Sequence, residues 1–155
     1  MKKLKNLLWL LICIGLFSCN SIQWGEVTTI GSIKQGNLFK LEPLKDTVLI
    51  LSGSEFSITN IDFKCISLQN NEGIKYKSAV SLPSSSSTGL SSFETISGKE
   101  FEFWPKDSKE QKIRIPITIL PTTQKYEGKG QVYLYLVDST EMCISNIIAW
   151  KIKFK

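Results

Sequence analysis

Residues 112–119, KIRIPITI, alternate strictly between isoleucine and other side chains. A β-strand points successive side chains to opposite faces, so it would gather these isoleucines on one side, whereas a helix would scatter them around its circumference. Pro116 interrupts the other face and cannot donate a hydrogen bond to a neighbouring strand. The segment is therefore predicted to be a strand at a sheet edge or at a bulge.

The same period of two recurs along much of the chain. Residues 132–136 place valine and leucine on one face and Tyr133 and Tyr135 on the other, and residues 148–154 alternate in the same way. Further strands are predicted at 26–34, 37–41, 47–51, 57–68, 73–82 and 100–104. Residues 47–51 are apolar on both faces, which predicts a central strand.

Turns rich in Gly, Asn, Ser and Pro separate these runs, so that eight or nine strands follow one another at intervals of roughly ten residues. No segment of ten or more residues after the N-terminal run has a clear helical period. This pattern predicts an all-β, antiparallel sandwich of immunoglobulin-like arrangement, with a closed barrel as the alternative.

The N-terminus has a different character. A basic start at residues 1–5 precedes the apolar run 7–17, LLWLLICIGLF, which ends at Ser18 and Cys19. As a helix this run would cover only about half of a ~30 Å hydrocarbon core. It is too short to span a bilayer permanently and suits the apolar core of a secretion signal. The alternative is a buried first element of the fold.

The end of this run resembles the lipobox of bacterial lipoproteins. Leu16 is the branched apolar residue three positions before Cys19, and Ser18 is the small residue directly before it. The resemblance implies cleavage after Ser18 and attachment of fatty chains such as palmitate to Cys19, which would tether the protein to a membrane. Asn20, the next residue, implies the outer membrane on its periplasmic side. The alternative is ordinary cleavage that leaves Cys19 as a free thiol.

The predicted organisation is a signal peptide at 1–18, a lipidated cysteine with a short linker at 19–25, and a β-sandwich domain at 26–155. The full chain carries 19 Lys plus Arg and 14 Asp plus Glu. Three lysines leave with the signal, so the count falls to 16 against 14, a net charge of +2. The basic residues are scattered and include a single arginine, which argues against nucleic-acid binding.

The sequence contains no histidine. The commonest general base and the commonest metal ligand are therefore missing, together with every nucleophile that depends on imidazole. A non-catalytic protein without a metal or a small-molecule cofactor is predicted. Glu100 and Glu102 lie on one face of a predicted strand and leave a carboxylate hydrolase as a remote alternative.

Two cysteines remain once Cys13 has left with the signal and Cys19 has been lipidated. Cys65 and Cys143 would then face an oxidising compartment, where leftover thiols usually pair. A disulfide between them is predicted, similar in position to the bridge that joins the two sheets of immunoglobulin-like domains. The alternative is two buried free cysteines acting as small apolar groups.

Candidate contact residues are few. Trp104, Tyr133 and Tyr135 are predicted on exposed strand faces, and Leu90 is the apolar tip of the serine-rich loop 82–92. The leading hypothesis is an accessory or structural envelope protein that binds another envelope protein. The alternative is a carbohydrate- or peptidoglycan-binding module that uses these aromatics. Burial of the tyrosines on a second strand face is the competing explanation. Trp24 is predicted either to rest on the membrane or to pack against the first strand.

Overall fold

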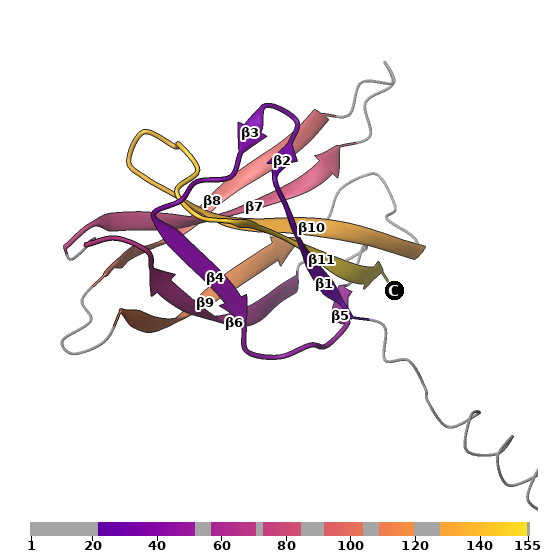
Figure 1. Ribbon diagram of the computed structural model, residues 1–155. Helices are drawn as coiled ribbons and strands as arrows, with labels where there is room; N and C mark the ends of the chain where they lie inside the picture. The colour runs from indigo at the N-terminus through magenta and orange to yellow at the C-terminus, as the bar shows by residue number, and fades with distance from the viewer. Residues whose placement is uncertain are drawn as a thin grey trace, which may run out of the picture.

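The computed structural model describes residues 22–51, 57–70, 73–84, 92–103, 109–119 and 128–154 (Figure 1). Within these ranges there are eleven strands and no helix, and so none that could cross a membrane. The strands are β1 (Trp24–Val27), β2 (Thr29–Ile30), β3 (Ile33–Lys34), β4 (Phe39–Pro43), β5 (Leu49–Leu51), β6 (Ser57–Ser67), β7 (Lys75–Ser84), β8 (Ser92–Glu102), β9 (Glu110–Ile119), β10 (Gly128–Val137) and β11 (Ile147–Phe154).

The larger sheet has the strand order β1-β11-β10-β7-β8, and every pair along this path is antiparallel. β5 joins the sheet beside β11 and runs parallel to it. β1 pairs with the first half of β11 and β5 with its second half, so the two short strands share one edge of β11. The prediction that residues 47–51 form a central strand is wrong, because β11 is the only strand that β5 pairs with among the described residues.

The smaller sheet has the order β4-β6-β9, also antiparallel. β9 covers the sequence KIRIPITI and pairs with β6 alone in the described part of the chain. Pro116 therefore lies in an edge strand, as predicted, opposite Asn60. Ile113, Ile115 and Ile117 are buried, whereas Arg114 between them is exposed and Pro116 is half-buried.

The two sheets pack face to face around one main core, which confirms the predicted antiparallel β-sandwich (Figure 1). Trp150 and Phe63 meet in the middle of the core with an edge-to-face geometry and ring centroids 6.2 Å apart. The indole Nε1 of Trp150 donates a hydrogen bond to the carbonyl oxygen of Thr47 at 2.9 Å. This bond joins β11 to the chain leading into β5.

A second, smaller core lies on the outer face of the larger sheet. The β2–β3 hairpin lies over this face and packs Ile30 and Ile33 against side chains of β7, β10 and β11 (Figure 1). Part of β10 is therefore covered on both sides, and residues 134–137 are all buried. When both faces of a strand are buried, the alternation of its side chains does not indicate which face points to the main core.

The hairpin of β7 and β8 is longer than the sequence predicted. β8 begins at Ser92, whereas the predicted strand began at residue 100, and the register continues to the pair Ser84 and Ser92. The ends of the serine-rich stretch therefore belong to the ladder. Backbone pairing requires no apolar side chain, so this part of the hairpin leaves no hydrophobic pattern in the sequence.

Candidate functional site

The predicted disulfide between Cys65 and Cys143 is not formed, and both thiols are free. Cys65 is fully buried in the main core between the two sheets. Cys143 packs against the second core, on the outer face of the larger sheet. The larger sheet therefore separates the two sulfurs, which is the physical reason for the correction. The immunoglobulin-like arrangement stays a prediction, since the bridge that suggested it is absent.

Burial governs the chemistry of both thiols. Desolvation raises the pKa of Cys65 from 9.0 to about 12, and an interaction with Tyr76 opposes this shift. Burial also raises the pKa of Cys143, whose Sγ donates to the carbonyl oxygen of Ser145 at 3.2 Å. The Tyr76 hydroxyl that makes this interaction is buried as well, and burial raises its pKa. Neither cysteine resembles an activated nucleophile, which would need a lowered pKa.

Both thiols are expected to resist modification in the folded protein at pH 8, because the reactive thiolate is rare when its pKa is raised. Cys65 should also make the protein less stable above pH 9. The pKa of Cys65 is about 12 in the folded state, above the ordinary thiol value of 9.0 that applies to the unfolded chain. The folded state therefore holds the thiol proton more tightly than the unfolded state. The contribution of Cys65 to the free energy of unfolding is then fully present below pH 9. It falls by about 1 kcal/mol for each pH unit between pH 9 and about pH 12.

Maleimide labelling with and without urea tests the first expectation, and urea unfolding at several alkaline pH values tests the second. The Cys65→Ala variant should have a shallower alkaline slope, although its own stability is lower. Rapid labelling of Cys65 in the folded protein, or a non-reduced mass that corresponds to a disulfide, would contradict the account.

The predicted contact aromatics do not form one surface. Tyr135 is buried beneath the β2–β3 hairpin, and its hydroxyl lies 2.8 Å from Ser81 Oγ in a hydrogen bond, so the prediction of an exposed contact is wrong there. Tyr133 is half-buried against the same core, and its hydroxyl donates to Gln131 Oε1 at 3.4 Å. Trp104 and Leu90 lie outside the described residues, as do Ser18 and Cys19.

The end of the sandwich where the described chain begins is called the proximal pole here; it comprises Ile22 to Trp24, β5 and the end of β11. Gln23 is held on both sides, since its N–H donates to Asp46 Oδ1 at 2.8 Å and its carbonyl accepts from the N–H of Lys151 at 2.8 Å. The Nζ of Lys151 donates to the carbonyl oxygen of Ile22 at 2.8 Å. These bonds fasten the first described residues to the edge of β11.

Trp24 directly follows Gln23 in the sequence. Its partner in the β1–β11 register is Trp150, and it packs, partly buried, against the main core. Of the two roles predicted for Trp24, packing against the fold is therefore the one observed. β1 also begins at Trp24, inside the predicted linker 19–25, so only Asn20 and Ser21 separate Cys19 from the first described residue.

The opposite end is called the distal pole here; it comprises the β10–β11 loop, residues 138–146, and the end of β6. In the loop, Asp138 Oδ1 accepts hydrogen bonds from Thr140 N at 2.8 Å, Thr140 Oγ1 at 2.7 Å and Met142 N at 3.0 Å. The bond from Thr140 is the main cause that lowers the pKa of Asp138. Glu141 completes the turn with a φ of 63°.

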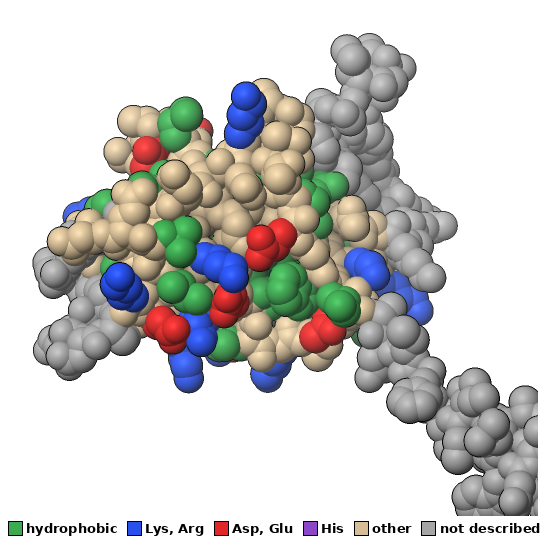
Figure 2. Space-filling model, in the orientation of Figure 1, with side chains coloured by type: hydrophobic (Ala, Val, Ile, Leu, Met, Phe, Trp, Pro, Cys, Tyr) green, Lys and Arg blue, Asp and Glu red, His purple; other side chains and the backbone are tan. Residues whose placement is uncertain are grey.

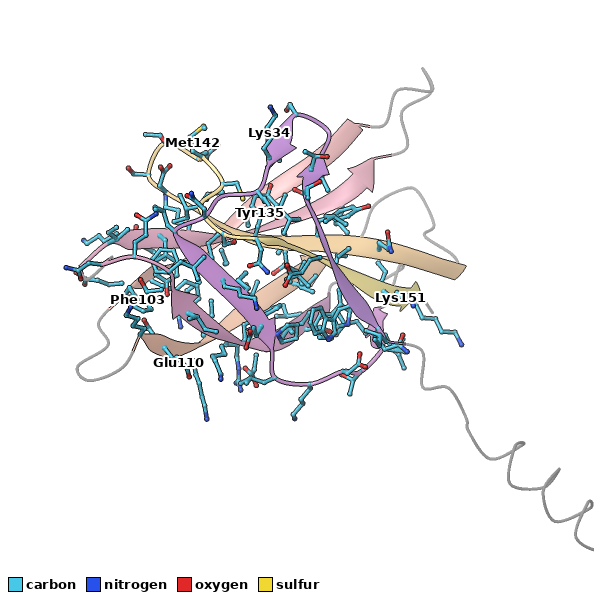
Figure 3. All side chains as sticks on the ribbon, viewed as in Figure 1. Lys34, Phe103, Glu110, Tyr135, Met142 and Lys151 are labelled. Carbon is cyan, nitrogen blue, oxygen red and sulfur yellow. The ribbon has the colours of Figure 1, made fainter. Side chains whose placement is uncertain are left out.

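Two large apolar side chains are exposed at the distal pole. Met142 is 66% exposed at the tip of the β10–β11 loop, and Leu68 is 51% exposed just after β6. Leu38 links the two sites, because its carbonyl accepts from the N–H of Leu68 at 2.9 Å and its N–H donates to Ile144 at 3.0 Å. Figure 3 shows Met142 and Lys151 at opposite ends of the molecule. Met142 lies outside every predicted strand, and Leu68 is only the last residue of the predicted strand 57–68, so no pattern in the sequence marked these two residues as one surface.

The outer face of the smaller sheet carries charges of both signs (Figure 2). Arg114 holds Asp62 through two bonds of 2.6 and 3.2 Å, and further ion pairs join Lys64 to Glu110 at 3.3 Å and Lys40 to Glu42 at 2.9 Å. These pairs are solvent-exposed, and such pairs contribute little to stability. Across the part of the chain that the structure describes, no three His, Cys, Asp or Glu side chains gather as they would to hold a metal ion.

Comparison with known proteins identifies no family. No family model matches the chain, and no curated protein matches its sequence. Among solved structures, the alkylpurine DNA glycosylase AlkC of Pseudomonas fluorescens, bound to DNA, has a TM-score of 0.48 at 15% identity and is matched over 76% of this chain. The chain spans only 30% of the length of that protein.

Two other solved structures are similar at a lower level. A Niemann-Pick type C2 protein from the Japanese carpenter ant has a TM-score of 0.43 at 11% identity, over 82% of this chain and 100% of that one. A protein of Bacteroides fragilis named as a β-galactosidase has a TM-score of 0.35 at 10% identity, over 81% of this chain and 17% of that one. No activity is transferred to this chain from similarities of this size.

Proposed function

We propose that this chain is a lipid-anchored protein of the bacterial cell envelope, held on the periplasmic side of the outer membrane. It acts there as a non-catalytic accessory subunit that binds another envelope protein through its distal pole. The lipobox-like residues 16–19 support the anchor, and the exposed apolar residues of the distal pole support the protein partner.

The short connection between anchor and domain supports a role close to the membrane. Only Asn20 and Ser21 separate Cys19 from Ile22, a reach of at most about 11 Å when fully extended. The hydrogen bonds of Gln23 to Asp46 and Lys151 hold the start of the domain on the sheet edge, so these residues do not lengthen the tether. A domain on so short a tether suits a subunit of a membrane assembly better than a receptor that must reach far.

The observation that carries the binding hypothesis is the exposure of Met142 on a loop that Asp138 holds in place. Methionine adapts its flexible, polarisable side chain to a partner surface, and it is enriched in protein interfaces. Because the loop is fixed before binding, docking would cost little ordering entropy. Leu68 extends the apolar surface at the same pole.

The carbohydrate-binding alternative loses one of its residues. Sugar-binding platforms need aromatic faces open to solvent, and the ring of Tyr135 lies beneath the β2–β3 hairpin. Tyr133 is only partly open. The described aromatics therefore favour the protein partner over the sugar.

The anchor is tested by Cys19→Ser in the full chain. The substitution removes the sulfur that would carry lipid, so the protein is expected to leave the membrane fraction and to lose metabolic labelling by palmitate. Ser21→Ala, close to the cysteine but outside the lipobox, is the matched control and should change neither result. Retention of the Cys19→Ser protein in membranes, or absence of label on the unaltered protein, would overturn the anchor.

The partner is tested by placing a photo-crosslinking residue at Met142 in cells. One stoichiometric adduct with an envelope protein is expected from this position, and none from Lys112, which is exposed on the outer face of β9. No adduct at Met142, together with retention of the purified protein on peptidoglycan, would overturn the protein-binding role in favour of the carbohydrate alternative.

A further inference from the structure

The proximal pole carries a surface on which three exposed aliphatic side chains lie beside two lysines. The aliphatic residues are Ile22, Val48 and Ile50, which are 64%, 46% and 52% exposed. The lysines are Lys151 and Lys153, both exposed on β11. These five residues are called the proximal patch here.

The strand register explains why most of the patch lies on one face. Ile50 is the direct partner of Lys153 in the β5–β11 pair, so their side chains point to the same side. Lys151 is two residues before Lys153 on β11 and shares that side, and Val48 is exposed directly before β5. On the opposite face, Leu49 and Ile152 face each other in the same ladder and are buried in the main core.

The position of the patch follows from the bonds at the start of the domain. Lys151 donates through its Nζ to the carbonyl oxygen of Ile22, which keeps Ile22 beside the end of β11. The carboxylate of Asp46 also lies here and accepts the N–H of Gln23. In Figure 3 the side chain of Lys151 extends away from the strands at this end. Aliphatic and cationic side chains therefore lie close to Ile22, the described residue nearest to Cys19 in the sequence.

We propose that the proximal patch rests on the bilayer that holds the lipid anchor, with its aliphatic side chains at the interface and its lysines against anionic phospholipid headgroups. This inference depends on the proposed lipidation of Cys19. The tether of at most about 11 Å keeps Ile22 close to the headgroup region, which is about 5 to 8 Å deep on each side of the bilayer, so the patch meets the membrane first. Lysines beside apolar groups suit such a surface, because their stems lie along apolar atoms while their ammonium groups bind phosphates.

The orientation that follows connects the two poles. With the proximal patch on the lipid, the distal pole and its exposed Met142 face away from the membrane and toward a partner. The membrane would thus fix which end of the sandwich is offered for protein binding. A freely tumbling domain would offer the distal pole only part of the time.

The test uses the full-length, lipidated protein in vesicles of phosphatidylethanolamine and phosphatidylglycerol. A fluorophore is placed on Ile50→Cys, or on Leu68→Cys as a matched control of equal exposure at the distal pole. Brief labelling favours the exposed, introduced thiol over the native Cys65 and Cys143. The unaltered protein, labelled in the same way, gives the background fluorescence from those native thiols. A phospholipid with a nitroxide on its headgroup is expected to quench the fluorophore at position 50 and not at position 68.

Charge reversal sharpens the test. Each lysine at an anionic surface contributes about fivefold to docking, so Lys151→Glu combined with Lys153→Glu should weaken docking by at least roughly 25-fold and remove most quenching at position 50. Lys109→Glu combined with Lys112→Glu makes the same change in net charge on β9 and its approach, and should leave the quenching intact.

The outcomes separate the two proposals. If the protein does not sediment with the vesicles, the anchor itself fails. If it sediments and the quenching is equal at positions 50 and 68, the anchor stands and the proximal patch is overturned. Quenching at position 50 that is indifferent to reversal of Lys151 and Lys153 also overturns the patch, because the lysines would then have no part in docking.

Discussion

Gly36→Ala is expected to destabilise the protein by about 3 kcal/mol, the upper range for overpacking. A Cβ added at Gly36 would lie within 3.0 Å of backbone atoms of Cys143 and Ile144, an approach that real Cβ atoms essentially never show. Backbone cannot move aside as a flexible side chain can. The segment that joins β3 to β4 would have to move away from the β10–β11 loop.

The displacement would break several hydrogen bonds at once. The N–H of Gly36 donates to the carbonyl oxygen of Ser145 at 2.8 Å, and the N–H groups of Leu38 and Phe39 both donate to that of Ile144 at 3.0 Å. These bonds join the start of the smaller sheet to the end of the larger one. Losing them leaves buried polar groups without partners.

Urea unfolding followed by tryptophan fluorescence measures the effect, since the buried Trp150 reports on the core. Gly25→Ala is the matched control, because nothing lies within 4 Å of the Cβ it would add. That change should be neutral or slightly stabilising, by at most about 1 kcal/mol. A Gly36→Ala midpoint close to that of Gly25→Ala would show that the close approach has no energetic consequence.

Asn146→Ala is expected to cost about 3 kcal/mol, because it leaves two buried backbone groups unsatisfied. The Asn146 amide is 7% exposed and binds Leu41 as a neighbouring strand would. Its Oδ1 accepts the N–H of Leu41 at 2.6 Å, and its Nδ2 donates to the carbonyl oxygen of Leu41 at 3.1 Å. Leu41 is itself fully buried, so water cannot easily replace the lost bonds.

The control for this prediction is Asn60→Ala on β6, where the asparagine is exposed. It should change the free energy of unfolding by less than about 0.5 kcal/mol. Equal effects of the two substitutions in urea unfolding would mean that the side chain of Asn146 does not support β4. Unchanged stability of Asn146→Ala would have the same meaning.

Alternation predicted the strands best where one face is buried and the other meets solvent. β9 shows this clearly, since its isoleucines fill the core and Pro116 marks the edge. The same rule misjudged Tyr135, because the β2–β3 hairpin covers the second face of β10. That cover comes from a segment about a hundred residues away in sequence, and no local pattern encodes it.

The candidate site shows the same limit. The pairing of Cys65 and Cys143 rested on compartment and parity, which are blind to the sheet that separates the two sulfurs. The sequence patterns did not predict the proximal patch either. Residues 47–51 are apolar at every position but the first, which predicted burial on both faces, yet Val48 and Ile50 are exposed because β5 ends at the margin of the sheet.

The position of β11 constrains how this molecule is made. The last strand of the chain lies between β10 on one side and β1 and β5 on the other, and it contributes Trp150 to the middle of the core. A chain that extends only as far as β10 lacks this strand, so β1 and β5 have no partner to pair with. The sandwich therefore cannot be completed until residues 147–154 have been added, so the long-range pairing of β1 forms late in folding.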